Sequence, residues 1–277
     1  MDARLFWLKR VTALKQKRLL IAPLLTIVLK TCLLRLTSYS LISVLMLIIR
    51  SAVFYMGYLL SGLIASIIAC IFGPFLNLND RLRLFSLWPR FANWFLAFTC
   101  NVRVEMKGQE NLPKTPCVIV SNHQGQWETF SMQYLFHPLS TLLKRELLFI
   151  PIWGWAMSLL KPIAINRGRP REALLKALAE GQKRLNDGFY VLFFPEGTRV
   201  GPGEVHPYSR SGFELAVRAG VPVLPIVHNS GDCWPAHKFI KYPGTIYITI
   251  GKPHKVVEAK ISSKEIEEWT RASLKRS

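Results

Sequence analysis

The fold is decided by the stretch Cys117-Val-Ile-Val-Ser-Asn-His-Gln-Gly-Gln-Trp-Glu-Thr-Phe130. Its first five residues form an apolar run that predicts a buried strand, and a helix is predicted from Gln126 to Phe136. His123 therefore lies at the turn from strand to helix. In open α/β sheets this is where the chemistry is usually held, so the stretch predicts an α/β domain with His123 in its site.

Glu128 follows His123 by five residues, so its carboxylate can fold back from the first helical turn toward the imidazole. A carboxylate bonded to one ring nitrogen fixes the tautomer and makes the other nitrogen a better base. The pair therefore indicates a general base. The alternative that it leaves open is a polar turn that merely contains a histidine.

The rest of the chain alternates between predicted strands and helices. Strands are predicted at 102–106, 142–144, 163–165, 189–194, 221–227 and 245–250, and helices at 152–160, 169–186 and 212–219. A capping-box pattern at Ser262 and Glu265 predicts a closing helix. This alternation indicates an α/β domain with a mixed, mostly parallel sheet flanked by helices. Two prolines confine the strand at 221–227 to an edge or a bulge.

The composition narrows the classes of protein to consider. The five cysteines are scattered, which argues against a disulfide framework or a zinc site and fits a reducing compartment. The net charge of +19 suits nucleic acid, an anionic membrane surface or a phosphorylated substrate. Because half of the residues are hydrophobic and the mean hydropathy is positive, we favour the membrane.

The first 45 residues are predicted to be a basic N-terminal extension in which Asp2 is the one acidic residue. The apolar run Leu19–Leu29 within it is shorter than the about 20 residues that span a bilayer. No small-residue cleavage site is followed by a polar mature start, so a secretory signal is not indicated.

Residues 46–100 are predicted to form a membrane-associating helical region. The segment Ser51–Asn79 carries no charge and is long enough for a transmembrane helix. Arg50 and Arg81 flank it with positive charge on both sides, which gives no inside–outside asymmetry. We therefore favour a hairpin of two apolar helices in one leaflet, with a single span as the alternative. Four residues offer places to bend: Gly57, Gly62, Gly73 and Pro74.

Another predicted strand end carries groups suited to an anion. The run Phe194-Pro-Glu-Gly-Thr-Arg199 ends a buried strand, and Gly197 lets the backbone turn so that its N–H groups point at an anion. Thr198 adds a hydroxyl, and Arg199 adds a forked cation suited to phosphate. A surface turn with an Arg–Glu pair is the alternative.

Two weaker basic groups follow other strand ends. Arg167, beside Gly168, could offer a second guanidinium to the same anion, and Lys144 could add a third cation. Each of them is also consistent with a solvated surface charge. His228 ends the proline-containing strand and has no carboxylate near it in sequence, so we rank it below His123 as a base.

In this order, the blocks resemble the lysophosphatidic acid acyltransferase family (1-acylglycerol-3-phosphate O-acyltransferases) of the glycerolipid acyltransferase superfamily. Asn122, His123 and Glu128 correspond to the family pattern N-H-x-x-x-x-D/E. The run 194–199 corresponds to F-P-E-G-T-R nearly letter for letter. The two other family blocks correspond to residues 154–168 and 221–225.

The resemblance covers about Met46 to Ile250 and includes two departures. Glu128 replaces the commoner Asp, which sets the carboxylate one methylene further out and leaves the base role in place. Asn166 stands where Asp is frequent. Because residues 1–45 match nothing in the family, we hypothesise that translation begins at Met46. Peptides from residues 1–45 of the native protein would contradict this.

The resemblance implies a single acyltransferase domain over residues 101–277. It would move an acyl group from acyl-CoA or acyl carrier protein to the sn-2 hydroxyl of lysophosphatidic acid, giving phosphatidic acid for phospholipid biosynthesis. The enzyme is expected to lie at the cytoplasmic face of the inner (plasma) membrane, with the phospholipid membrane as a partner. No metal or organic cofactor is expected to take part.

The resemblance also assigns roles to residues of this chain. His123 would be the catalytic base and Glu128 the carboxylate that orients it. The substrate phosphate would be held by Lys144, Arg167, Glu196, Gly197, Thr198 and Arg199. The site would be shaped by Asn122, Gly168, Pro195 and Pro225.

Two alternatives remain open at the level of sequence. A sister acyltransferase could use another lyso-lipid as acceptor, such as a lyso-ornithine lipid or a lipid A precursor. A non-enzymatic basic membrane protein or nucleic-acid binder would account for the charge. It would not account for His123 and Glu128 joined to an anion-binding turn, and no nucleic-acid partner is expected.

Overall fold

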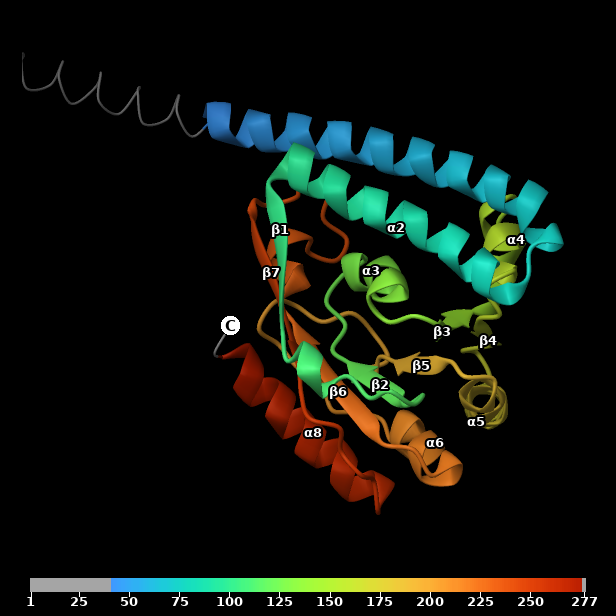
Figure 1. The fold of residues 1–277 in the computed structure, drawn as a ribbon. Coiled ribbons are helices and arrows are strands. Elements are labelled where there is room, and N and C mark those ends of the chain that lie inside the picture. The colour runs from blue at the N-terminus through green and yellow to red at the C-terminus, as the bar shows by residue number, and fades with distance from the viewer. Residues whose placement is uncertain (1–40, 276–277) are drawn as a thin grey trace, which may run out of the picture. The chain divides into compact units, whose positions relative to one another are not determined.

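A seven-stranded sheet forms the centre of the molecule in the computed structural model, which describes residues 41–275 (Figure 1). The strands are β1 (Val102–Lys107), β2 (Val118–Ser121), β3 (Leu139–Lys144), β4 (Ile163–Ile165), β5 (Tyr190–Phe193), β6 (Val223–His228) and β7 (Gly244–Ile250). Their order is β1-β7-β6-β2-β5-β3-β4. Every neighbouring pair is parallel except β6 and β7. The predicted mixed, mostly parallel sheet is thus confirmed.

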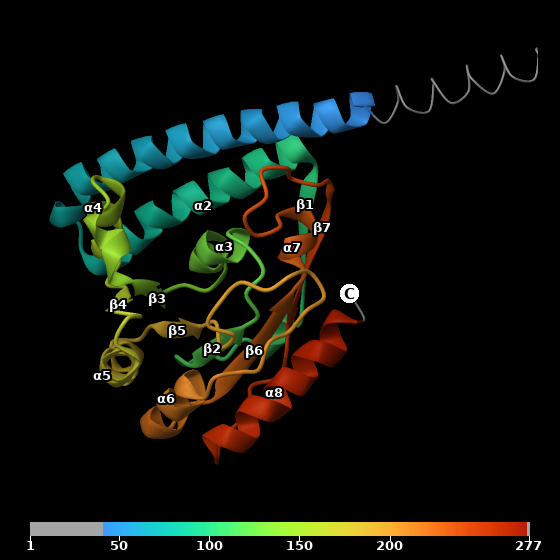
Figure 2. The same ribbon diagram turned by 180° about the vertical axis from the view of Figure 1, so that it is seen from behind.

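Helices cover both faces of this sheet (Figures 1 and 2). They are α2 (Leu78–Cys100), α3 (Trp127–Leu135), α4 (Trp153–Ser158), α5 (Pro170–Asn186), α6 (Ser211–Ala219), α7 (Ser230–Cys233) and α8 (Ala259–Leu274). Short 3-10 turns are η1 (Gly73–Phe75), η2 (Gln109–Asn111) and η3 (Arg145–Phe149). The helices α2 and α3 lie over one face, and α5, α6 and α8 over the other. The helices predicted at 126–136, 152–160, 169–186 and 212–219 are all present.

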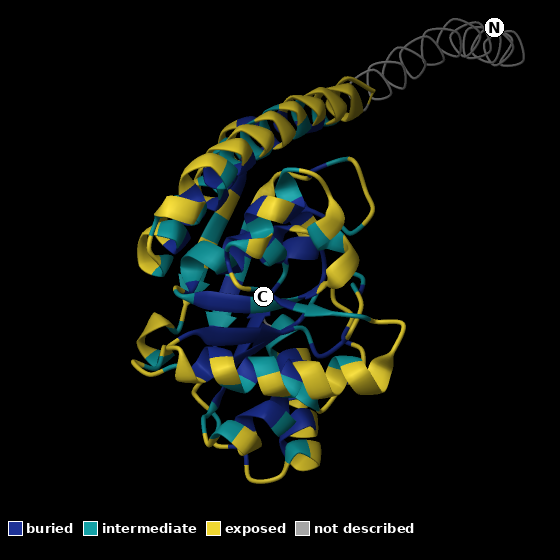
Figure 3. Cartoon of the chain, turned by 90° about the vertical axis from the view of Figure 1, so that its right-hand side faces the viewer, coloured by how far each residue is buried: buried dark blue, intermediate teal, exposed yellow. Residues whose placement is uncertain are grey.

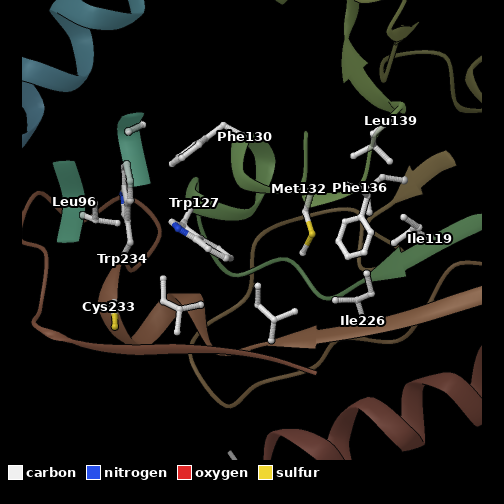
Figure 4. Packing of buried hydrophobic residues seen from close by; sticks show 14 of the residues in the cluster. Leu96, Ile119, Trp127, Phe130, Met132, Phe136, Leu139, Ile226, Cys233 and Trp234 are labelled. Carbon is white, nitrogen blue, oxygen red and sulfur yellow. The ribbon is translucent and has the colours of Figure 1, made fainter. Parts of the chain in front are cut away.

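The alternation along β2 divides the core into two layers, because successive side chains of a strand point to opposite faces. Ile119 packs into the layer that contains Trp127, whereas Val118 and Val120 pack into the layer that contains Phe213. Figure 4 shows the first layer, where buried aromatic side chains fill the space between α3 and the sheet. Since both faces of β2 are covered, its continuous apolar run is what a buried parallel strand requires.

One long apolar helix covers Leu41–Phe75 and is long and apolar enough to cross a membrane by length and composition. Only 22% of an apolar 18-residue stretch within it is buried, and its exposed side is prominent in Figure 3. From Arg50 onward it packs along α2: Arg50 Nε donates to the Thr99 carbonyl at 2.8 Å. Within the segment 51–79 the structure thus has one continuous apolar helix where two were predicted. The helix that packs against it is α2, which starts at Leu78 and carries charged residues such as Asp80 and Arg81. We call the long helix and α2 the helix pair.

Two of the glycines expected to bend this region do not bend it. Gly57 and Gly62 lie inside the continuous helix, where an added Cβ would meet the rings of Phe95 and Trp88. They are small so that the two helices can approach closely. The chain reverses at η1 instead, where Arg81 donates to the carbonyls of Gly73, Leu76 and Leu159 at 3.0, 3.1 and 3.3 Å.

Of the two positions predicted for the proline-containing strand, the edge is wrong, because β6 lies between β7 and β2. The bulge is present: the pairing with the β7 side runs to Ile226 and Ile250 and resumes at Val223 and His254, shifted by one residue. Pro225 pairs with Val120 of β2, and its carbonyl accepts from the Gly251 N–H at 2.9 Å. The N and the C=O of one strand residue face the same side. The missing N–H of Pro225 therefore faces the β7 side, next to the point where the regular pairing stops at Ile250 and shifts by one residue.

The capping box predicted at Ser262 and Glu265 is also wrong. The N-cap of α8 is Glu258, so Ser262 lies within the helix. Ser262 Oγ and Glu265 Oε2 both contact His254 Nε2 instead, at 2.9 and 3.3 Å. The basic tail and the apolar run at 19–29 lie outside the described residues, apart from 41–45, which belong to the long helix.

Candidate active site

The site lies where the parallel strands β2, β5 and β6 end side by side. His123 follows β2, the run from Phe194 follows β5, and His228 is the last residue of β6. Because the carboxyl ends of parallel strands meet at one edge of a sheet, segments far apart in sequence are brought together there.

The predicted pairing of His123 with Glu128 is present: Nδ1 lies 2.8 Å from Glu128 Oε1. Glu128 is fully buried, and Oε1 also accepts from the backbone N–H groups of Gln124 and Gly125 at 2.8 and 2.7 Å. Its other oxygen accepts from Ser230 Oγ at 2.8 Å. The carboxylate is thus fixed from both sides.

The protonation of this pair follows from its surroundings. Burial alone raises the pKa of Glu128, but the hydrogen bond from the His123 ring, the neighbouring His228 ring and the Gly125 amide outweigh it and hold the pKa below the usual range. An ionised carboxylate can only accept, so Nδ1 of His123 carries the proton. Nε2 then has a free lone pair, and among the described residues it has no hydrogen-bond partner.

The turn at 194–200 forms hydrogen bonds to the backbone N–H and C=O of His123. Glu196 Oε2 accepts from the His123 N–H at 2.7 Å, and the Val200 N–H donates to the His123 carbonyl at 2.8 Å. The ring of Phe194 stacks on the imidazole, with centroids 4.2 Å apart. Burial raises the pKa of Glu196 to about 7, against the opposing backbone hydrogen bonds from His123 and His206.

Asn122 and His228 tie β2 to β6 beneath the site. Asn122 Nδ2 donates to the His228 carbonyl at 2.8 Å, and its Oδ1 accepts from the His228 N–H at 3.0 Å. Nε2 of His228 lies 3.0 Å from the Asn122 carbonyl, and Nδ1 lies 3.3 Å from the N–H of Ser230. Both ring nitrogens of this buried histidine are therefore engaged, and burial lowers its pKa. His228 is a structural residue rather than a free base.

The second sequence block is joined to the third. Arg167 Nη1 donates to the Gly197 carbonyl at 3.3 Å, and the N–H of Gly168 donates to Asn166 Oδ1 at 3.0 Å. Gly197 has φ of +69°, the left-handed conformation that favours glycine. Arg167 and Gly197 are both exposed, so the guanidinium lies beside a turn that solvent and ligands can reach.

The remaining predicted site residues lie at different depths. Thr198 is exposed on the same turn, whereas Arg199 is half-buried and lines a cavity. Lys144 is exposed at the end of β3, paired in register with Ile165, two residues before Arg167. The Pro195 carbonyl accepts from the Ser209 N–H at 2.9 Å. Together with Pro225 in β6, Pro195 belongs to the scaffold.

Sequence reasoning did not find two buried contacts of this site. Ser230 reaches Glu128 across 102 positions of the chain, and the N–H of Gly231 donates to Gln124 Oε1 at 3.0 Å. The available signal was the turn-forming run Asn229-Ser-Gly-Asp232 directly after β6. The parallel pairing of β6 with β2 places such a turn next to His123.

Comparison with known proteins gives relatives of one kind. The acyltransferase family model matches residues 103–229. The 1-acyl-sn-glycerol-3-phosphate acyltransferase of Pseudomonas aeruginosa is 46% identical over 204 residues, which cover 73% of this chain and 79% of the relative. The 1-acyl-sn-glycerol-3-phosphate acyltransferase alpha of Mus musculus is 33% identical over 205 residues, covering 72% and 70%.

A solved structure supports the fold. The crystal structure of the 1-acyl-sn-glycerophosphate (LPA) acyltransferase from Thermotoga maritima has a TM-score of 0.70 at 20% identity, covering 82% of this chain and 94% of that one. The fold is thus shared at low identity, while the relative from Pseudomonas aeruginosa matches most of both chains at 46%. The chain accordingly belongs to the 1-acyl-sn-glycerol-3-phosphate acyltransferase family of acyltransferases.

Proposed function

We propose that this acyltransferase moves an acyl group from acyl-CoA or acyl carrier protein to the sn-2 hydroxyl of 1-acyl-sn-glycerol-3-phosphate. The product is phosphatidic acid, used in phospholipid biosynthesis. The observation that carries the proposal is the 2.8 Å contact between His123 Nδ1 and Glu128 Oε1, made in a chain whose relatives are named for this acceptor.

In the first step, Nε2 of His123 accepts the proton of the sn-2 hydroxyl as its oxygen attacks the thioester carbonyl carbon. Glu128 stabilises the imidazolium that forms, since its ionised oxygen accepts from Nδ1–H. General-base assistance of this kind contributes roughly 10²–10⁴-fold. The ring is held for the task by its stacking on Phe194 and by the bonds to both backbone groups of His123.

In the second step, the tetrahedral intermediate collapses and the carbon–sulfur bond breaks. The leaving thiolate takes the proton from the imidazolium, which returns His123 to its neutral form and releases a free thiol. The acyl group ends as an ester of the acceptor. No acyl-enzyme is needed, because the thioester is already an activated acyl donor.

The phosphate of the acceptor is assigned to the basic groups around the 194–200 turn. Arg167 lies on the Gly197 carbonyl, and Arg199 and Thr198 follow on the same turn. Lys144 adds positive charge from the neighbouring strand end. Holding the phosphate places the hydroxyl beside His123, and positioning of this kind is worth several kcal/mol of barrier.

The apolar helix pair is assigned to the membrane, at the cytoplasmic face of the inner membrane. The outer side of α2 exposes Trp94 and Phe98, at 59% and 72%, and the long helix exposes Leu60 and Met56, at 58% and 67%. An exposed apolar surface that carries tryptophan suits the interfacial region of a bilayer, where lipid substrate and product reside. We assign residues 46–100 to this region, 101–277 to the catalytic domain and 1–45 to a basic extension.

The test is acyl transfer to lysophosphatidic acid in detergent or vesicles, with acyl-CoA and acyl carrier protein offered in parallel. Phosphatidic acid is the expected product, and the faster donor identifies the thioester that the enzyme uses. Lyso-ornithine lipid and a lipid A precursor serve as competing acceptors. If one of them is acylated while lysophosphatidic acid is not, the proposed acceptor is wrong.

A further inference from the structure

The cavity that Arg199 lines lies beside the turn that carries His123. It has a volume of about 250 Å³ and is lined by Tyr55, Gln126, Arg199 and the segment from Trp234 to Phe239. A site for one water needs only about 10–15 Å³ by a comparable measure, so this cavity takes a group of phosphate size. Its Gln126 wall is three residues from His123.

The two charged residues that line this cavity, Arg199 and Lys238, are both basic. Arg199 enters from the 194–200 turn, and His237 and Lys238 come from the loop after α7. No acidic residue is among the described residues that line it. A guanidinium and an ammonium that line one small cavity repel each other unless an anion lies between them, and phosphate is an anion that both groups bind by strong, charge-assisted hydrogen bonds.

The loop that carries Lys238 is held in place by a buried lysine. Lys241 is fully buried, and its Nζ donates to the carbonyls of Lys238 and Phe239 at 3.0 and 2.9 Å. The same ammonium lies 4.6 Å from the centre of the Tyr55 ring and 4.8 Å from that of Trp234. Lys241 thus fixes the backbone of Lys238 against the helix that carries Tyr55.

A stacked pair of rings closes the same wall. Phe239 stacks on Tyr55 with centroids 5.3 Å apart and planes 20° apart, and Tyr55 makes an edge contact with Trp234, a member of the core cluster shown in Figure 4. Lys238 itself is exposed, so binding a ligand does not require its ammonium to leave a buried partner. The wall is fixed while the cation at its rim is accessible.

From this geometry we infer that the cavity is a phosphate site in which Lys238 acts with Arg199, with His237 at its edge. Lys238 is then a substrate-binding residue that none of the family blocks contains. The inference rests on the proposed function, because it takes the phosphate to be that of a substrate: either the headgroup of lysophosphatidic acid or the phosphates of acyl-CoA.

The test compares wild type with Lys238→Ala, Lys238→Arg and the charge control Lys260→Glu, an exposed lysine in the first turn of α8. KM and kcat are measured for lysophosphatidic acid, for acyl-CoA and for acyl carrier protein as donor. Lys238→Ala should raise one substrate's KM about tenfold, the worth of a hydrogen bond to a charged group, with kcat within about twofold. Lys238→Arg should restore most of the affinity, and Lys260→Glu should leave every KM unchanged.

The pattern of KM values identifies the source of the phosphate. A rise confined to lysophosphatidic acid, with either donor, places the acceptor headgroup in the cavity. A rise confined to acyl-CoA and absent with acyl carrier protein places the phosphates of the adenosine part of CoA there, since acyl carrier protein lacks them. Unchanged KM values for all three substrates in Lys238→Ala overturn the inference and leave the proposed function standing. A wild type that makes no phosphatidic acid refutes the proposed function itself.

Discussion

Around His123, both oxygens of the buried Glu128 receive donors from the protein, whereas along the outer side of the helix pair large apolar side chains face outward. In the first region, these polar contacts are all made within the chain itself. The second leaves apolar surface exposed, and this surface becomes favourable only against another apolar phase. Under the proposed function, the difference means that the chemistry is preorganised inside the domain, while access to the lipid depends on the surroundings.

The largest expected effect breaks the first region. His123→Ala removes the proposed base and should lower the rate of acyl transfer by roughly 10²–10⁴-fold. The fold should survive, because the hydrogen bonds from the 194–200 turn go to the backbone of residue 123, which the substitution keeps. The rate of thiol release and a thermal unfolding curve check this.

The matched control for that variant is His206→Ala, an exposed histidine whose backbone N–H alone contacts Glu196. It should keep wild-type activity. Retained turnover in His123→Ala would remove this residue from the mechanism, and equal losses in both variants would point to a general effect on the turn.

A change of pH tests how well the region around His123 is shielded from solvent. The folded pKa of Glu196 is raised from 4.5 to about 7 by burial, so between these values the folded protein keeps a proton that the unfolded chain releases. The unfolding free energy should therefore fall as pH rises through this window. The fall is about 3 kcal/mol at most, from 1.36 kcal/mol per pKa unit.

Glu196→Gln cannot titrate, so its unfolding free energy should lack this part of the slope. Urea unfolding at intervals from pH 5 to 8, done on both proteins, gives the difference directly. Parallel curves for the two proteins would show that Glu196 is ionised in the fold throughout.

A third change separates binding from chemistry at the border of the first region. Arg199→Ala should raise the KM for lysophosphatidic acid by roughly ten- to a hundredfold, since hydrogen bonds to charged groups are worth about 1.5–3 kcal/mol. The KM for the acyl donor should change less. Steady-state kinetics with each substrate varied in turn measures both, and an effect confined to the donor would place Arg199 at the thioester's own phosphates.

The smallest expected effect concerns the second region. The double change Trp94→Ser and Phe98→Ser removes two exposed rings from α2 and should weaken partition to anionic vesicles by about tenfold. Activity on substrate in detergent should stay near wild type, because neither ring contacts the site. Vesicle flotation gives the partition coefficient.

The control double change, Leu175→Ser with Val257→Ser, removes two exposed apolar side chains outside the helix pair: Leu175 in α5 and Val257 shortly before α8. Partition should be unaffected. If both double variants lose the same affinity, the helix pair is not the specific docking surface.

Features that depend on neighbours in the chain were predictable from sequence. The contact between His123 and Glu128 spans five residues, and the helices end at Gly188 and Gly220, both with positive φ, as their sequence signals indicate. Local geometry alone decides these features, so spacing and residue type are enough.

Features that depend on which distant segments lie side by side were not predictable from sequence. The position of Pro225 in a central strand depends on the shift in pairing beside it, between Ile226–Ile250 and Val223–His254. Gly57 makes room for a ring that lies 38 positions later, and Ser230 reaches Glu128 across the sheet. Each of these requires knowing which distant segment lies alongside, which periodicity does not contain.

The buried amine of Lys241 can also report on local opening of the protein. A lysine-directed acylating reagent reaches exposed amines such as Lys238 and Lys252 in the folded protein, but it reaches Lys241 only when the segment around it opens. The labelling rate of that single amine, read by mass spectrometry, therefore measures the free energy of a local opening. Protection of this amine when substrate is added would record ligand binding without any assay of turnover.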